Sequence, residues 1–346
     1  MSIIFTIIIL GIIIFLHELG HFMTAKYYKM PVLEFAIGMG PKVFSKKINE
    51  TAYSIRLLPL GGFVNIGGMQ PEDDPEKQVK DGFYTKSPFS RFVVLIAGIM
   101  MNFISSIIAI FIMLSVTGGV PAGYIKPIVG SVNENSAAKN VLQVNDRITE
   151  INGKKIKNWE DLANAIYKIN EKGYNGENIS LKIMRDNKEI NTDIKLTYSE
   201  ELKINALGIV AAQAKISFFQ KISASFYTFG NYFKVMADGL KMLITGKVSV
   251  KEVTGPVGLP KYVGQAYKDG GGIGLLNIFI LLSINIGLMN LLPIPALDGG
   301  RLLFVIPEFF GIKVNKKIEE RIHMIGMLLL LGLMVFIVFN DVMKYF

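Results

Sequence analysis

Residues 3–28 read IIFTIIILGIIIFLHELGHFMTAKYY and decide the fold class of this chain. The stretch is longer than the roughly 20 apolar residues that span a bilayer, so it predicts a membrane-spanning helix. His17 and His21 lie four residues apart, on one face of that helix, where both imidazoles can bind one metal ion. Glu18, beside the first histidine, is then placed to act as general base toward a water molecule at the metal.

Polar side chains within an apolar span are costly, roughly 2.5–3.5 kcal/mol for a charged residue at the centre. That cost is tolerated where the side chains line a cavity and bind a ligand. The alternative, a helix end with polar residues at the membrane interface, does not require the spacing of His17 and His21, which is typical of zinc peptidases. The stretch therefore predicts a hydrolytic metal site inside a membrane.

The composition agrees with a membrane protein. Hydrophobic residues make up 51% of the chain and charged residues 19%, and the mean hydropathy is +0.40. The net charge of +9 does not indicate a nucleic-acid partner, because the basic residues are scattered and form no stripe with aromatic residues. There is no cysteine, which excludes disulfides and thiolate metal ligands. No basic segment precedes the first apolar run, so we expect a retained span and not a cleaved signal peptide.

Three more apolar segments, 92–117, 273–292 and 324–339, complete a predicted fold of four transmembrane helices. Between the first two spans, 32–44 and 52–63 read as strands of a membrane-associated β element with Gly61-Gly62 as a turn or bulge. This element either offers a strand edge to an extended substrate or plugs the cavity as a structural hairpin.

Residues 215–247 are amphipathic and predict a helix lying on the membrane surface. A Gly/Pro-rich segment, 254–260, and a flexible segment, 269–272, are expected to follow before the third span.

The third metal ligand is predicted where the third span ends. Pro293 and Pro295 break the helix there, and Asp298 follows in a loop-like Leu-Asp-Gly-Gly segment. An acidic residue at a broken helix in an apolar setting is a functional candidate, although an aspartate before two glycines can also simply form a turn. Two histidines and one carboxylate, with an open fourth position, make a catalytic zinc site. His323, at the start of the last span, is expected at the membrane interface and not as a ligand.

The second span carries Gly98 and Asn102, four residues apart. A small residue such as Gly98 lets helices approach closely. A buried amide such as Asn102 must form hydrogen bonds, either toward the metal cavity or with a neighbouring helix.

Residues 121–200 have frequent charges and alternating strand and helix patterns, which predict a separate folded domain. The succession from Val129 through Ser136-Ala137-Ala138 to Asn145-Asp146-Arg147 and Asn152-Gly153 resembles a PDZ domain, present in a single copy. Such a module binds peptide segments by strand addition, or here acts as a steric filter above the cavity.

The basic residues predict the orientation of the chain. The segments between the first two and between the last two spans are rich in lysine and arginine, which places both in the cytoplasm. Both termini and the PDZ-like domain are then extracytoplasmic, and the His pair and Asp298 fall at the same depth.

Together, the HELGH motif of the first span, an inserted PDZ domain and NLLPIPALDGG in the third span resemble the site-2 protease family, most closely its bacterial regulator-of-sigma-E protease type. This resemblance implies a zinc intramembrane metalloprotease of the bacterial inner membrane. Its partners are single-pass transmembrane substrates such as anti-sigma factors or signal-peptide remnants, and the lipid bilayer. Regulated intramembrane proteolysis is the expected process.

The resemblance also assigns roles residue by residue. His17, His21 and Asp298 match zinc ligands, and Glu18 matches the catalytic glutamate. The implied substrate-binding residues are Asn102, Asn285 and Asn290. Ile99 departs from the family pattern, in which a proline commonly follows the glycine.

We predict the following parts, in chain order: 1–29, first transmembrane helix; 30–91, β region; 92–117, second helix; 121–200, PDZ domain; 201–272, amphipathic helix and linker; 273–300, third helix; 301–323, cytoplasmic loop; 324–341, fourth helix. Two other classes of function compete with the protease: a non-catalytic membrane adaptor, and a membrane-anchored zinc peptidase that cuts soluble segments. The location of His17 and His21 within an apolar span argues against the latter.

Overall fold

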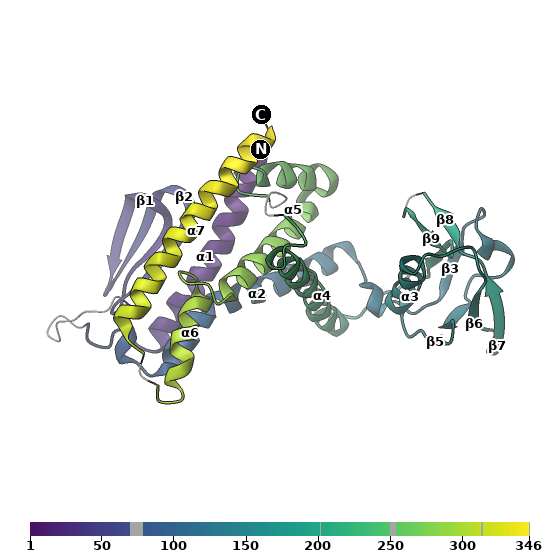
Figure 1. Ribbon diagram of the computed structural model, residues 1–346, viewed down its shortest axis with the longest axis horizontal. Helices are drawn as coiled ribbons and strands as arrows, with labels where there is room; N and C mark the ends of the chain where they lie inside the picture. Colours follow the sequence, from purple (N-terminus) through teal and green to yellow (C-terminus); the bar gives the residue numbers. More distant parts are fainter. Residues whose placement is uncertain (70–78, 201, 250–253, 313, 346) are drawn as a thin grey trace. The chain divides into compact units, whose positions relative to one another are not determined.

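The computed structural model describes residues 1–69, 79–200, 202–249, 254–312 and 314–345, and it divides into two compact units (Figure 1). The first unit comprises Met1–Met113 with Tyr227–Phe346, and the second is Leu114–Phe226. Parts of three predicted segments lie outside the described residues, namely 70–78 of the β region, 201 and 250–253 of the linker region, and Lys313 of the last basic loop.

The first unit is mainly helical, and four of its helices are long and apolar enough to cross a membrane, which confirms the predicted fold class. These are α1 (Ser2–Tyr27), α2 (Pro88–Thr117), α5 (Leu259–Leu291) and α7 (Lys316–Tyr345). The most apolar 18-residue window of α2 is 56% buried, whereas that of α7 is 11% buried. Helix α2 is therefore the inner wall of the unit, and α7 presents most of its apolar surface outward. The remaining elements are β1 (Val32–Ile48), β2 (Thr51–Ile66), the 3₁₀ turn η2 (Phe83–Thr85), α4 (Phe218–Ile244) and α6 (Asp298–Glu308).

Strands β1 and β2 form the predicted β element, and each strand bends so that it pairs twice. Residues 34–37 pair on one side with 62–65 and on the other with 52–55, and 42–48 pair with 51–56. Within the described chain the outer strands of the sheet are therefore 42–48 and 62–66, and the element lies beside α1 (Figure 1). Both strands run past the predicted ends because Asn49, in the left-handed conformation (φ 53°), closes a tight turn between Ile48 and Thr51.

The segment at 269–272 is not the flexible linker that the glycines predicted. It lies inside α5, which begins at Leu259 and continues through a kink at Gly271 (φ 54°, ψ −133°). A kink of this kind requires a conformation that glycine adopts without steric cost. The helix is long because the residues before the kink pack as well: Val263 is fully buried in one apolar cluster with Ile9 and Ile13 of α1.

The segment around Asp298 is also not a loop. Asp298 is the first residue of α6, which folds back on the end of α5. A Cβ atom at Gly299 would lie 2.6 Å from the carbonyl carbon of Leu291, so only glycine permits this approach. The predicted cytoplasmic loop 301–323 is likewise mostly helical, because Leu302 and Val305 of α6 pack into a buried cluster with residues of α1, α2 and the β element.

The second unit has the strand and helix order expected from its sequence. Its elements are η3 (Ala122–Tyr124), β3 (Val129–Val132), η4 (Ala137–Asn140), β4 (Arg147–Ile151), β5 (Lys154–Lys155), α3 (Trp159–Glu171), β6 (Ile179–Arg185), β7 (Lys188–Ile194), β8 (Thr197–Ser199), β9 (Ile204–Ala206) and β10 (Ile209–Ala211). A sheet in the order β5-β4-β6-β7 packs on α3, around a core that includes Ile148, Leu181 and Ile183. The predicted end of this domain at residue 200 is too early, because β10 pairs with β3 and completes the fold.

One buried ion pair stabilises this second unit. Asp146 is 1% exposed, and its carboxylate accepts hydrogen bonds from the Arg185 Nε and Nη2 (2.7 Å each) and from the backbone N–H of Gln143 (2.7 Å). Burial alone would raise the pKa of Asp146, but the hydrogen bonds from Arg185 and Gln143 and the attraction of the guanidinium outweigh it and lower the pKa below its ordinary value.

We expect Arg185→Ala to lower the free energy of unfolding of this unit by about 3 kcal/mol at pH 7, because the buried carboxylate loses its partner. Since the pKa of Asp146 is lower in the folded state, the stabilisation is complete above the unfolded pKa and is lost as the pH falls through the folded pKa. Limited proteolysis of the full chain at pH 7 and pH 3 measures both effects.

Lys139→Ala is the matched control, because Lys139 pairs with Glu134 in an exposed ion pair worth at most about 1 kcal/mol. Equal proteolysis rates for the two variants at pH 7 would contradict the prediction.

Candidate metal centre

The two histidines of α1 face the interior of the first unit. His17 and His21 are each 8% exposed, one helical turn apart, and their Nε2 atoms lie 3.2 Å from each other. The rings meet edge to face, with centroids 4.8 Å apart. This geometry directs one nitrogen of each imidazole at a common point.

Asp298 reaches that point from the far end of the sequence. Its Oδ2 lies 3.1 Å from the Nε2 of His17 and 3.2 Å from the Nε2 of His21. The three atoms thus form a nearly equilateral triangle. Within the described part of the chain, this is the only group of three such side chains close enough to share a metal ion.

Helix α2 forms the wall behind the histidines. The His21 Nδ1 lies 2.7 Å from the carbonyl oxygen of Val94, to which it donates its proton, and this leaves Nε2 free as a ligand atom. Gly98 gives the rings their space: a Cβ atom there would lie 2.7 Å from the Cε1 of His21 and 2.9 Å from the Cε1 of His17. Helix α2 runs unbroken past Gly98, and Ile99, which departs from the family's proline, is fully buried within it.

Comparison with known proteins identifies the family. The model of peptidase family M50 matches residues 5–333. The chain belongs to this family. A protein of Fusobacterium nucleatum, named as a zinc metalloprotease, is 43% identical over the whole length of both chains. The zinc metalloprotease RasP of Geobacillus kaustophilus is 31% identical, over 100% of this chain and 98% of its own. The regulator of sigma-W protease RasP of Bacillus subtilis is 30% identical, over 98% of each.

A solved structure, the PDZ domain of an SdrC-like protein from Listeria innocua, covers 26% of this chain and 96% of its own length at 27% identity, with a TM-score of 0.23. Together with family M50, the relatives confirm the predicted resemblance to site-2 proteases. This chain is therefore a zinc metalloprotease and a multi-pass membrane protein, with Zn²⁺ as its cofactor.

The residues at the triangle fit a zinc ion. A tetrahedral zinc site with ligand distances of about 2.0–2.1 Å has edges of about 3.3 Å between ligand atoms, close to the 3.1–3.2 Å separations found here. The Asp298 Oδ2 is buried and, among the described residues, has no hydrogen-bond donor of its own. A buried carboxylate oxygen of this kind requires a cation or a proton nearby.

Asn102 completes the support of His17. It is fully buried, and its amide Nδ2 lies 3.3 Å from the His17 Nδ1, while its Oδ1 has no hydrogen-bond partner in the described chain. A histidine that offers Nε2 to zinc carries its proton on Nδ1, so it needs an acceptor there. Turning the amide by 180° brings the Asn102 oxygen to that proton and satisfies both groups.

The backbone carbonyl of Asn102 accepts hydrogen bonds from Ser105, one turn further along α2, and from Ser283 of α5, each 2.9 Å long. Of the two alternatives from the sequence, the side-chain amide of Asn102 takes the one toward the histidines, whereas its contact with α5 comes from the backbone.

Glu18 stands at the side of the triangle that faces the β element. Its Oε2 accepts a 3.0 Å hydrogen bond from the backbone N–H of Val64, in the edge 62–66 of the sheet. A Cβ atom at Gly62 would lie 3.7 Å from the Glu18 Cγ, so the sheet edge and the carboxylate are in direct contact. The sequence predicted the edge strand and the glutamate but not their contact.

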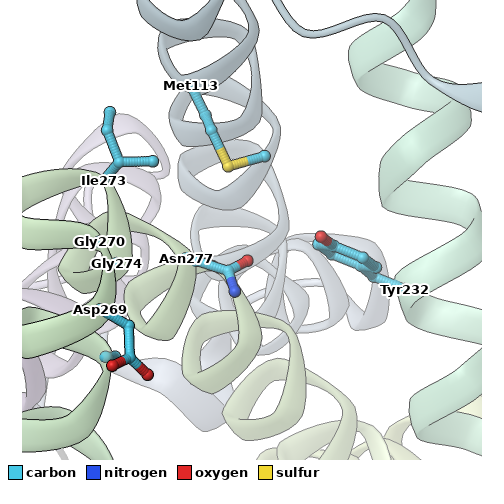
Figure 2. A pocket seen from close by; sticks show the side chains of 8 residues that line it. Met113, Tyr232, Asp269, Gly270, Ile273, Gly274 and Asn277 are labelled. Atoms are coloured by element: carbon cyan, nitrogen blue, oxygen red, sulfur yellow. The ribbon is translucent and has the colours of Figure 1, made fainter. Parts of the chain in front are cut away.

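The two other predicted substrate residues lie on α5. Asn285 is exposed and Asn290 is half-buried. A pocket of about 460 Å³ lies further along α5, near the kink, and Figure 2 shows Asn277 of α5, Tyr232 of α4 and Met113 of α2 around it. None of the three triangle residues lines this pocket, so it is separate from the metal centre.

His323, which the sequence places at the membrane interface, is buried in the first unit, and its depth in a bilayer stays a prediction. It is 7% exposed, and its Nδ1 accepts a 2.8 Å hydrogen bond from the backbone N–H of Ala296, two residues before Asp298. Helix α7 begins at Lys316, about two turns before the predicted span, so His323 lies within the helix and not at its start. The signal that could have revealed its role is a titratable residue within an otherwise apolar helix.

We expect Gly98→Ala to lower the zinc affinity of the protein at least tenfold, because the added methyl group displaces the rings of His21 and His17. Chelator competition on the purified protein in detergent measures the affinity. Gly332→Ala on α7, where an added Cβ meets no atom within 4 Å, is the control and should change nothing. Equal affinities for the two variants would show that the close approach at Gly98 does not matter.

Proposed function

We propose that this chain is a zinc-dependent intramembrane protease that cleaves the transmembrane segments of single-pass membrane proteins. In this proposal His17, His21 and Asp298 bind the zinc ion. The observation that carries it is the triangle of 3.1–3.2 Å between their ligand atoms, formed by a helix long and apolar enough to span the membrane and by the start of α6. A metal centre among such helices is placed to meet a peptide bond inside the bilayer.

When bound, zinc supplies Lewis-acid chemistry: it polarises the scissile carbonyl and makes a water molecule more acidic. Glu18 accepts the proton of the attacking water and later returns it to the leaving amine. The N–H of Val64 holds one oxygen of Glu18, which leaves the other carboxylate oxygen for proton transfer. His21, bonded to the carbonyl of Val94, and His17, beside Asn102, keep the ring orientation that this chemistry requires.

A transmembrane substrate must leave its helical conformation before cleavage, because a helix shields its own carbonyl groups. Among the described residues no strand pairs with the outer side of 62–66, and this edge touches Glu18, so we propose that the unwound segment adds to it as a strand. Asn285, exposed on an apolar helix, and Asn290 are our candidates for binding this segment or the oxyanion. Asn102 is fully buried against His17, which supports a role in orienting that ligand in addition to any contact with substrate.

The name of the Bacillus subtilis relative, regulator of sigma-W protease, supports membrane regulators as substrates. We propose anti-sigma factors or signal-peptide remnants of the bacterial cytoplasmic membrane as the substrate class. The basic loops support an orientation with both termini and the PDZ domain outside the cytoplasm. In that position the domain filters substrates by size or binds a peptide segment.

Glu18→Gln is expected to retain zinc and to lower the rate of cleavage of a model transmembrane substrate at least 100-fold, because glutamine cannot accept the proton. Mass spectrometry of the products also locates the cut. A cut within the hydrophobic segment of the substrate supports the proposal, and a cut only in its soluble part would replace it with a membrane-anchored peptidase. Unchanged turnover would reject Glu18 as the base.

Asp298→Ala is expected to lower zinc affinity by at least 100-fold, because it removes one of three protein ligands and leaves the buried histidine pair alone. Zinc content after dialysis, measured by atomic absorption, checks this. Asp269→Ala, which removes an exposed carboxylate on α5 bonded only to Gln265 in the described structure, is the control. Full zinc content in the Asp298 variant would reject that residue as a ligand.

A further inference from the structure

The chain segment that leads into Asp298 has an unusual conformation. Ala296 has φ of 79°, in the left-handed region that a residue with a Cβ atom rarely adopts. It follows Pro295, whose ring restricts its own backbone, and it lies two residues before Asp298. Such a conformation persists only where surrounding contacts hold it. The direction in which α6 begins, and so the position of the Asp298 carboxylate, depends on this turn.

Helix α7 supplies those contacts. The Nδ1 of His323 accepts a hydrogen bond of 2.8 Å from the backbone N–H of Ala296. The His323 ring also packs against Phe304 of α6, with ring centroids 5.5 Å apart. One turn further along α7, a Cβ atom at Gly326 would lie 2.7 Å from the carbonyl oxygen of Pro295. The backbone of α7 therefore lies directly against the turn. His323 accepts the hydrogen bond from Ala296, the residue of the turn with positive φ.

The hydrogen bond from Ala296 explains the presence of a histidine at position 323. Its Nδ1 is the acceptor, so Nε2 carries the proton, and within the described residues that buried nitrogen has no partner. A leucine would fill the same space without burying an unsatisfied donor in an apolar helix. Among the described residues, the hydrogen bond from Ala296 is the polar interaction of His323 that a leucine could not replace.

We propose that His323 is a positioning residue for the metal centre: by holding Ala296 in the left-handed turn, it sets Asp298 in the triangle with His17 and His21. This inference rests on the proposed role of Asp298 as a zinc ligand. His323 itself touches neither the metal residues nor the substrate in this arrangement, and it acts through the backbone.

The test measures zinc affinity of the full chain in detergent by competition with a chelator, together with thermal unfolding. His323→Leu keeps the bulk and removes the acceptor, and it should lower zinc affinity about tenfold or more. His323→Asn places an acceptor near the position of Nδ1 and should retain most of the affinity. Ala296→Gly, added to His323→Leu, should restore affinity at least threefold, because glycine adopts positive φ without cost.

This rescue distinguishes positioning from packing, since glycine at 296 relieves the turn but repairs no side-chain contact. Phe304→Leu is the packing control and should stay within about twofold of the wild type, because the bond from Ala296 to His323 remains. A loss in Phe304→Leu equal to that in His323→Leu, without rescue by Ala296→Gly, would overturn the proposal in favour of simple packing.

Asp298→Ala separates this inference from the proposed function. Loss of zinc in Asp298→Ala with full affinity in His323→Leu would overturn the positioning role and leave the ligand assignment intact. Full affinity in Asp298→Ala would instead reject the ligand assignment and the positioning role with it. If His323→Leu does not fold, His323→Gln takes its place beside His323→Asn. Both are amides, but only asparagine carries its acceptor oxygen at the δ position. Equal zinc affinities of the His323→Gln and His323→Asn variants would therefore overturn the proposal.

Discussion

The structure depends on the need to bring three ligand atoms together in a setting that disfavours every one of them. His17 and His21 are buried between apolar helices, and so is the Oδ2 atom of Asp298, where an unpaired carboxylate or imidazolium is costly. In the proposed function, a zinc ion offsets that cost only if all three atoms meet it at the correct separation. The rest of the first unit can be understood as the framework that keeps two distant parts of the chain at this separation.

Helix α2 is the common wall of that framework. Its glycine at position 98 admits the imidazoles, and the carbonyl of Val94 and the amide of Asn102 orient them. The hydroxyl of Ser283 ties α5 to α2 by donating a hydrogen bond to the backbone carbonyl of Asn102. At the start of α2, the guanidinium of Arg91 forms a bidentate ion pair with Glu308, the last residue of α6. Helix α6 is thus held to α2 at its far end, and α7 holds the turn before its first residue.

The β element lies against Glu18, next to the candidate metal centre. Because each strand pairs twice, the sheet ends in an outer strand at 62–66, whose outward backbone groups have no strand partner among the described residues. One of these, the N–H of Val64, already bonds Glu18. In the proposed function, the same edge orients the base and receives the unwound substrate, so the scissile bond arrives beside the group that moves the proton.

The sequence alone determined the four spans, the histidine pair with its glutamate and the candidate third ligand, because these depend on local hydropathy, on helical spacing and on an acidic residue after a broken helix. It could not determine that 298–308 is a helix, that His323 is buried against Ala296, or that β10 completes the inserted domain. Each of these depends on contacts between residues far apart in the chain, such as those of Leu302 and Val305 with α1 and α2. Hydropathy and spacing report which residues can be buried or can bind a metal, whereas only tertiary packing decides which partner each one meets.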